Sequence, residues 1–319
     1  MLSEGAWWRH LRADPTGFLL DDEDPGLIHR VLVEVLERPL DSPAVERARA
    51  GARDRGSAAE ILRRQGPLGY WGSPAAYGAR WSGGAWHLLA AAWLGADPHD
   101  PRVIRGAENL LRQLEPSQGG FSVARNRPPA SCFTAEVCAA LVRLGFGRQP
   151  RVAEAVGWLI KRAEGSSGWT CPDLRHIVAG GCPVAAVGVL KLAAEMPAAE
   201  RFRVEGIVRH AVDWLSGQGF LLRPGSPKGW RRFSHPSLAR TDLLDSLTAL
   251  ARLGVAPSEE LLHGVRAVLQ LQGSDGCWRP AVTSSFGEPV GQPSRWLTFK
   301  ALVVLGAWGD ELEEMKEGM

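Results

Sequence analysis

The chain has 319 residues, of which 45% are hydrophobic and 23% are charged, proportions that suit a globular protein with a substantial core. The formal net charge of +2 predicts no strongly basic surface for nucleic acid or anionic membranes. Glycines and prolines interrupt every apolar stretch before it reaches the roughly 18 residues that span a bilayer, and the N-terminus has no signal-peptide pattern. An odd number of cysteines, five, favours reduced thiols, so we expect a cytoplasmic protein.

In residues 1–57 apolar side chains recur at helical spacing, but the segment contains no internal repeat. An acidic run at 21–24 is interpreted as a helix start, because acidic side chains favour the first turn of a helix. Apolar residues recur at helical spacing over 27–36, and Ser42 caps a further predicted helix that starts at Pro43.

Residues 58–319 contain a repeat with a period of about fifty residues, the mark of a repeat architecture. In each copy an aromatic residue follows a glycine-rich turn, at Trp71, Phe121, Trp169, Trp230 and Trp278. A half-apolar outer helix comes before the turn, at 102–114, 152–163, 204–215 and 258–271. An inner helix, apolar nearly all round, comes after a connector, at 83–94, 132–144, 182–194, 238–253 and 296–307.

Alternation of half-buried and fully buried helices predicts an all-α fold with two concentric helix layers. Five repeats and the N-terminal segment 1–57, which completes the ring, give about six helical hairpins in an α/α barrel that forms one domain. The connectors and the N-termini of the inner helices are expected at one rim of this barrel.

The turn motifs resemble those of the terpenoid cyclase and protein prenyltransferase family. Gln272 with the run 275–278 partly matches the Q-x-x-D-G-G-W turn of that family, as do the runs 119–121 and 167–169. More narrowly, the chain is similar to small single-domain bacterial relatives, through the following motifs: Ser131–Thr134, Gly168–Cys171, Gly181–Cys182, His235–Pro236 and Ser294–Thr298. The resemblance implies an α/α barrel with a central apolar cavity for a hydrophobic or isoprenoid-like molecule. Whether a partner subunit completes the site, as in protein prenyltransferases, stays open.

Four metal-binding side chains occupy similar places in successive repeats. Cys132 and Cys182 open consecutive inner helices, Cys171 follows the intervening tryptophan, and His235 precedes the next inner helix. Three thiolates and one imidazole are ligands that tetrahedral zinc prefers. Asp173 or His176 are alternates for His235 or for one cysteine. The competing interpretation is that the cysteines are small core residues.

Two carboxylates, Asp242 and Asp245, lie three residues apart in the predicted inner helix 238–253 and are expected to share a face. A buried charge needs a partner or a function, and Arg240 or Lys300 are candidate partners. Alternatively, one of the two acts as the acid that starts a carbocation cascade. Glu136 is a candidate for orienting a metal ligand or acting as a base.

Aromatic and basic side chains near the predicted rim complete the candidate site. Trp81, Trp86 and Trp296 are expected to line the cavity, where indole faces stabilise cations. Arg240 and Lys300 are candidates for contacting a diphosphate.

These features together predict a zinc-dependent enzyme that acts on a hydrophobic or isoprenoid-like small molecule by cyclisation, prenyl transfer or metal-assisted hydrolysis. Two alternatives stay open. One is a non-catalytic binding protein for a hydrophobic ligand with a structural zinc. The other is a metal-free enzyme, similar to class II cyclases, in which Asp242 is the acid.

Overall fold

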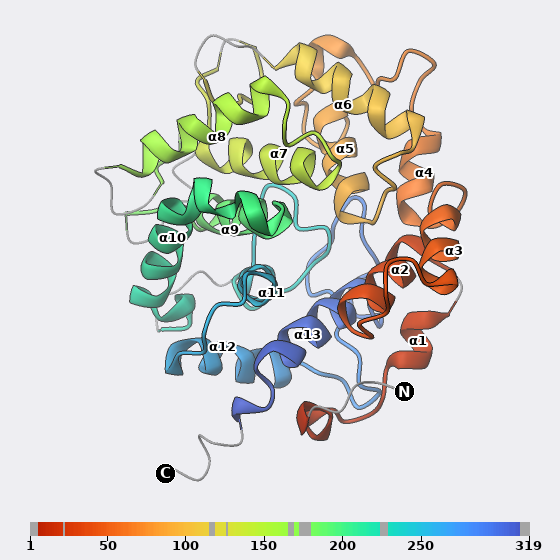
Figure 1. Cartoon of the computed structure of the whole chain (residues 1–319), viewed down its shortest axis with the longest axis vertical. Helices are drawn as coiled ribbons and strands as arrows, with labels where there is room; N and C mark the ends of the chain where they lie inside the picture. Colours follow the sequence, from red (N-terminus) through yellow and green to blue (C-terminus); the bar gives the residue numbers. More distant parts are fainter. Residues whose placement is uncertain are drawn as a thin grey trace. The chain divides into compact units, whose positions relative to one another are not determined.

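The computed structural model describes residues 6–21, 23–114, 119–125, 127–164, 169–171, 180–223 and 229–312. Throughout these ranges the regular elements are helices (Figure 1), and β-type pairing is confined to isolated bridge residues such as Trp278 and Ser294. The predicted all-helical class is therefore confirmed. None of the described helices combines the length and the apolar composition that a membrane span requires.

The chain forms two compact units, each built from segments far apart in sequence. The first unit comprises Met1–Gly51, Ser216–Ser237 and Thr241–Met319, and the second comprises Ala52–Leu215 with Leu238–Arg240. The predicted boundary after residue 57 and the closure of six hairpins into one ring stay predictions.

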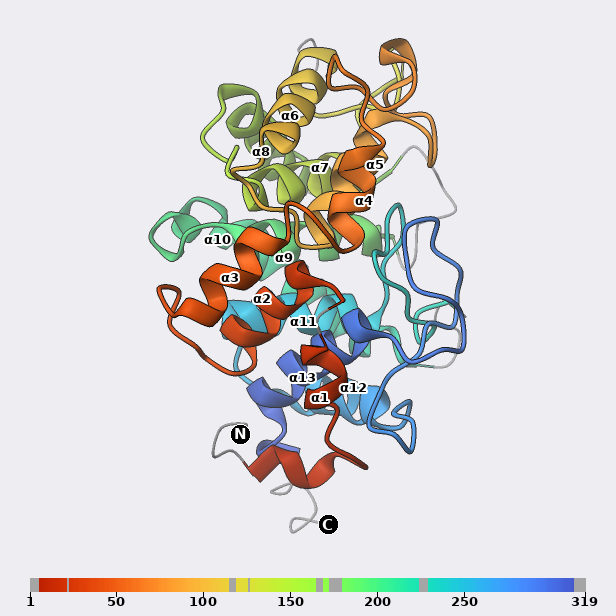
Figure 2. The ribbon, with the colours of Figure 1, turned by 90° about the vertical axis from the view of Figure 1, so that its right-hand side faces the viewer.

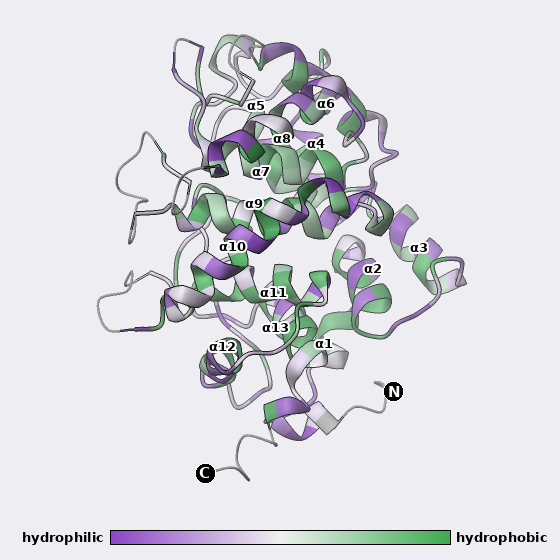
Figure 3. Ribbon diagram, turned by 60° about the vertical axis from the view of Figure 1, so that its left-hand side comes forward, coloured by the Kyte–Doolittle hydropathy of each residue, from purple (hydrophilic) through white to green (hydrophobic). Residues whose placement is uncertain are grey.

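The second unit contains alternating inner and outer helices. Its inner helices α5, α7 and α9 pack in series, with α6 against α5 and α8 against α7 (Figure 1). Residues 183–193 of α9 are all buried, as expected for an inner helix, and Figure 3 shows the largely apolar colouring of α7 and α9. The helices are α4 (Ser57–Arg63), α5 (Gly84–Trp93), α6 (Pro101–Gln113), α7 (Ser131–Arg143), α8 (Pro150–Ala163), α9 (Pro183–Glu195), η4 (Ala198–Val204) and most of α10 (Glu205–Gly217).

The first unit joins the two ends of the chain. Its inner helices α11 and α13 pack together, and α13 also contacts the N-terminal helices α1 and α2 (Figure 2). The Arg12 guanidinium donates a 2.7 Å hydrogen bond to the carbonyl oxygen of Gln272, which fixes the N-terminal segment to the last repeat. The helices are η1 (Ala6–His10), α1 (Thr16–Leu20), α2 (Pro25–Glu34), α3 (Pro43–Gly51), η5 (Gly219–Leu221), α11 (Leu243–Leu253), α12 (Glu259–Leu269) and α13 (Arg295–Trp308).

Three of the turn tryptophans attach their turn to the helix before it. In three repeats the indole Nε1–H donates to a backbone carbonyl ten residues earlier, and this bond attaches the turn to the outer helix. The bonds are Trp71 to Ile61 (2.9 Å), Trp169 to Leu159 (3.3 Å) and Trp278 to Val268 (2.8 Å). A second bond attaches the turn to the inner helix that follows, because the backbone N–H of Trp278 donates to the Thr298 hydroxyl at 3.0 Å.

Three inner helices end at the predicted Leu-Gly pairs. Gly95, Gly145 and Gly254 have φ values of 80°, 86° and 67°, the left-handed conformation that a residue with a Cβ adopts only at a cost. The sequence thus places these helix ends correctly.

Candidate metal centre and buried ion pairs

Three of the predicted metal ligands meet in the second unit. The sulfur atoms of Cys132, Cys171 and Cys182 all lie within 4.8 Å of one another. Cys132 is in the first turn of α7, Cys182 is the N-cap residue of α9, and Cys171 belongs to the connector that enters α9. Cys171 and Cys182 are buried, whereas Cys132 is partly exposed. In the described ranges this is the one group of three or more cysteine, histidine or carboxylate side chains close enough to share a metal ion.

Packing of α7 against α9 explains why residues fifty positions apart meet. The Ser131 hydroxyl donates a 3.1 Å hydrogen bond to the carbonyl oxygen of Thr170, which connects the start of α7 to the residue before Cys171. Gly181 allows the chain to pass close to Trp214, since a Cβ at this position would lie 2.7 Å from the indole ring. The sequence analysis missed Ser131 as a supporting residue, although its position next to Cys132 was a usable signal.

The sulfur cluster changes the acidity of its own thiols. Hydrogen bonding with Cys171 and Cys182, together with burial, raises the pKa of the Cys132 thiol far above its usual range. A hydrogen bond with Cys132 lowers the pKa of Cys182, but hydrogen bonding with Cys171 and burial outweigh it and raise this pKa to about 12. Neighbouring thiolates repel one another, so the ionised form of the cluster requires a cation among the sulfurs.

The predicted fourth ligand lies in the first unit. His235 is largely buried, and its ring stacks on Trp296 with a centroid separation of 4.9 Å and an interplanar angle of 19°. The role of His235 as a metal ligand stays a prediction. The alternates Asp173 and His176 lie outside the described residues.

The two aspartates do not share a helical face as predicted. Helix α11 starts at Leu243, not at residue 238, because Ala239 has a φ of 53° and Asp242 is extended. Asp242 is the N-cap: its carboxylate accepts hydrogen bonds from the N–H of Asp245 at 2.9 Å and of Ser234 at 3.2 Å. Periodicity alone does not distinguish an N-cap from the first helical turn.

Burial controls the ionisation of Asp242. The side chain is fully buried, which raises the pKa of Asp242 to about 7; the nearby Asp245 carboxylate contributes to the rise, and the Lys300 ammonium opposes it. Near neutral pH this carboxyl is therefore present in both protonation states.

Asp245 forms a buried ion pair with Lys300, one of its two predicted partners. Lys300 donates to one carboxylate oxygen of Asp245 and Ser237 donates to the other. Lys300 is 4% exposed, so a contact with a diphosphate would require this pair to separate. The other candidate, Arg240, lies partly exposed in the short segment Leu238–Arg240.

Glu136 forms a second buried ion pair, with Lys191 of α9. The Lys191 ammonium lies 2.8 Å from the Glu136 carboxylate and 4.3 Å from the centre of the Trp93 ring. The Glu136–Lys191 pair joins α7 to α9, and the Asp245–Lys300 pair joins α11 to α13. In each pair the two residues are 55 positions apart in sequence. The sequence analysis did not single out Lys191, although a lone charge in the apolar run 183–194 indicates a buried partner.

An aromatic chain runs beside the cysteine cluster. Ring centroids of Trp81 and Trp86 are 5.4 Å apart, and those of Trp86 and Phe133 are 5.6 Å apart. Phe133 directly follows Cys132, and Trp81 is 36% exposed. The three rings therefore form a chain of contacts in which Phe133 and Trp86 are buried and Trp81 is exposed. The third predicted aromatic, Trp296, belongs to the first unit, where it packs on His235 and Phe299.

The similarity of this chain to known proteins lies in its fold. No family model matches the sequence, and no curated protein matches it significantly. A crystal structure of a protein from Actinoplanes has 16% identity and a TM-score of 0.51, and the match covers 96% of this chain and 99% of that one.

Two further structures match at lower TM-scores. A type II terpene cyclase from Scytonema, bound to geranylgeranyl dihydroxybenzoate, has 16% identity and a TM-score of 0.45, with 91% of this chain and 88% of that chain covered. A polysaccharide lyase has 11% identity and a TM-score of 0.47, with 94% and 95% covered. At 16% identity, the likeness to the Actinoplanes protein is one of fold alone.

Proposed function

We propose that the chain is a zinc-dependent enzyme that acts on a hydrophobic, isoprenoid-like small molecule, with Cys132, Cys171 and Cys182 as metal ligands. The observation that carries this proposal is the meeting of three sulfur atoms within 4.8 Å. Zinc–sulfur bonds of about 2.3 Å in a tetrahedral site separate the sulfurs by about 3.8 Å, so the cluster needs only small adjustments to hold the ion. The charge of the ion would also stabilise the thiolates, against the hydrogen bonding and burial that raise the thiol pKa values of Cys132 and Cys182.

The number of protein ligands in the cysteine cluster and the aromatic residues near it favour a catalytic zinc ion over a structural one. Three protein ligands leave one position open, as catalytic zinc sites do, and a zinc ion there supplies Lewis acidity and lowers the pKa of a group that occupies that position. Cys132 is partly exposed, and the next residue on α7, Phe133, is the first of three rings in contact, followed by Trp86 and Trp81. These rings would bind the apolar body of a substrate and exclude water from one side of the ion. A fourth protein ligand, from His235, Asp173 or His176, would instead close the site and favour a structural zinc.

Metal analysis of the purified protein tests the ligand set. We expect one equivalent of zinc in the wild type after zinc supplementation, and its loss in Cys171→Ser. The control is Cys277→Ser, a buried cysteine of the last turn that lies in the first unit, outside the cluster. Absence of stoichiometric metal from the wild type, or its full retention in Cys171→Ser, would refute the site.

Cobalt substitution then distinguishes a catalytic ion from a structural one. Cobalt held by three thiolates gives strong thiolate charge-transfer absorption, and we expect added azide to shift the spectrum by entering an open position. A spectrum that azide leaves unchanged would indicate a closed, structural site. Turnover of prenyl alcohols and prenyl diphosphates, with and without zinc, tests the substrate class.

A metal-free cyclase-like enzyme is the second candidate, favoured by the full burial of Asp242 and its raised pKa of about 7. Its two backbone hydrogen bonds oppose this role, because N–H donors stabilise the ionised carboxylate. The Asp242→Asn variant distinguishes the metal-free enzyme from the zinc-dependent one. Loss of turnover in a protein that never bound metal would favour the acid mechanism, and zinc-dependent turnover that survives the change would exclude it.

A further inference from the structure

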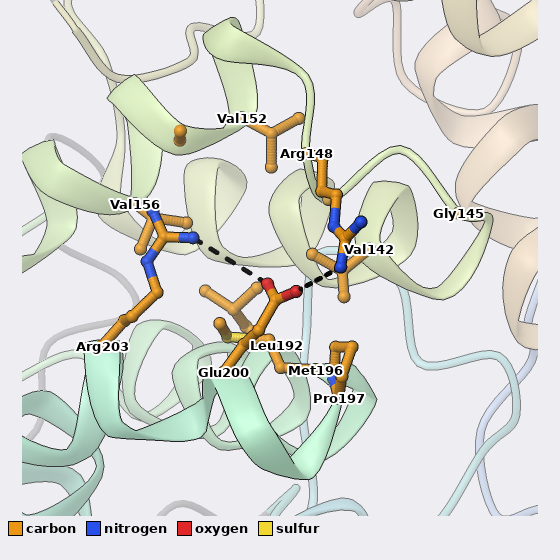
Figure 4. A pocket seen from close by; sticks show the side chains of 12 residues that line it. Val142, Gly145, Arg148, Val152, Val156, Leu192, Met196, Pro197, Glu200 and Arg203 are labelled. Atoms are coloured by element: carbon orange, nitrogen blue, oxygen red, sulfur yellow. Dashed lines mark hydrogen bonds and ion pairs between the residues drawn. The ribbon is translucent and has the colours of Figure 1, made fainter.

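A pocket of about 320 Å³ lies in the second unit, apart from the cysteine cluster (Figure 4). It is bounded by the end of α7, by α8, by the end of α9 and by η4. Its volume is at the lower end of the range of small-molecule sites, about 300 to 1,000 Å³. Helix α7 carries Cys132 in its first turn and Val142 of the pocket in its last turn, so roughly 15 Å of helix separates the two.

The floor of the pocket is apolar. Val142 and Val156 are partly exposed and Met196 is 8% exposed, so these side chains form its accessible surface; Val152 and Leu192 are fully buried behind them. Ala153 lines the pocket from an exposed position on α8. Such a surface binds the hydrocarbon part of a ligand through the area that it removes from water.

The rim of the pocket carries two arginines and one carboxylate. An Arg148 Nη lies 3.0 Å from one Glu200 oxygen, and an Arg203 Nη lies 3.9 Å from the other. Figure 4 shows the Glu200 carboxylate between the two guanidinium groups. Two positive charges and one negative charge leave the rim with one net positive charge. The Arg148 side chain is 88% exposed and that of Arg203 is 51% exposed, so both are able to turn toward a ligand.

We propose that this pocket binds a small amphipathic carboxylate, with its hydrocarbon body on Val142, Val156 and Met196 and its carboxylate on Arg148 and Arg203. Guanidinium groups match carboxylates with paired hydrogen bonds, and a single ligand anion neutralises the rim. A neutral ligand gains nothing from the arginines, and a cationic one is repelled. Glu200 forms ion pairs with both arginines, so its carboxylate competes with that of the ligand for the two guanidinium groups.

Calorimetric titration with octanoate, octan-1-ol and octylammonium tests the charge requirement on the full chain. We expect saturable binding of octanoate, weaker binding of octan-1-ol and none of octylammonium. Ala153→Trp fills the pocket from an exposed position and should abolish octanoate binding while the circular dichroism melting curve stays that of a folded protein. Equal affinities for octanoate and octan-1-ol, or no saturable heat with octanoate, would overturn the proposal.

Two substitutions with opposite expected signs test the rim. Arg203→Gln should weaken octanoate binding by about three- to fivefold, the magnitude of a partly exposed ion pair, and Glu200→Gln should strengthen it by a similar factor. Arg209→Gln is the matched control, because Arg209 is an exposed arginine paired with Glu205 outside the pocket. A weaker affinity in Glu200→Gln, or equal effects of Arg203→Gln and Arg209→Gln, would contradict the assigned contacts.

Discussion

The hydroxyl of Ser131 reaches the carbonyl oxygen of Thr170 across 39 residues of sequence. Each partner is the neighbour of a cysteine in the sulfur cluster: Ser131 precedes Cys132, and Thr170 precedes Cys171. The donor side is buried, since Ser131 is 1% exposed, whereas Thr170 is exposed. The bond fixes the two thiols relative to each other before any ion binds, and this arrangement lowers the cost of assembling the site.

Removal of this bond should weaken metal binding more than it weakens the fold. We expect Ser131→Ala to lower zinc affinity by about 10- to 100-fold, the effect typical of groups that orient metal ligands, as measured by competition with a chromophoric chelator. The control is Ser246→Ala, which removes a similar buried bond from a serine hydroxyl to the carbonyl oxygen of Leu243 in the first unit. If both variants bind zinc like the wild type, Ser131 does not position the ligands.

Disruption of the buried pair between Glu136 and Lys191 should be costly. Lys191→Met leaves a carboxylate in the core without its cation, so the free energy of unfolding should fall by about 3–5 kcal/mol in urea titrations. The same change at an exposed pair, Arg209→Met, should cost less than about 1 kcal/mol. A loss of comparable size in the two variants would mean that Lys191 contributes only as a surface charge.

The raised pKa of Asp242 predicts a specific pH dependence of stability. The folded state holds a proton on this carboxyl up to about pH 7, whereas the unfolded chain releases it near pH 4. The folded form thus binds more protons between these values, and its stability falls as pH rises through this window. Asp242→Asn keeps a good N-cap but does not titrate. Its free energy of unfolding, relative to the wild type, should therefore increase from pH 4 to pH 7.5. If the free energies of unfolding of the two proteins change in parallel from pH 4 to pH 7.5, Asp242 is ionised over this whole range.

The bond from a turn tryptophan to the preceding helix should have a measurable effect on stability. Trp278→Phe removes the donor to the Val268 carbonyl and should lower stability by about 1–3 kcal/mol, because that buried acceptor loses its partner. Trp230→Phe is the comparison, since the Trp230 indole nitrogen has no hydrogen-bond partner within the described ranges. The two substitutions remove similar volumes, so equal losses on thermal unfolding would assign the effect to packing and not to the hydrogen bond.

Local signals predicted most of the fold. Gly95, Gly145 and Gly254 mark helix ends because the left-handed conformation is a property of single residues, and the turn aromatics mark the repeat for a similar reason. The meeting of Cys132, Cys171 and Cys182 was also predicted, from the start of two consecutive inner helices at Cys132 and Cys182 and from the connector position of Cys171 between them.

The features that the sequence did not predict depend on contacts between residues far apart in the chain. The pairing of Lys191 with Glu136 and the bond from Ser131 to Thr170 require a known packing of α7 against α9. Asp242 was placed within the helix because its sequence pattern fits a helix, whereas the positive φ at Ala239 is set by the surrounding loop.

The anchored turns have a consequence for protein engineering. Trp71, Trp169 and Trp278 each form a hydrogen bond with the helix that precedes the turn, and Thr298 attaches the last turn to the helix that follows. The connectors between turn and inner helix are therefore not what holds a hairpin together. Side chains in the connectors should be open to substitution while the hairpins keep their packing, which makes these segments suitable for the design of new binding sites.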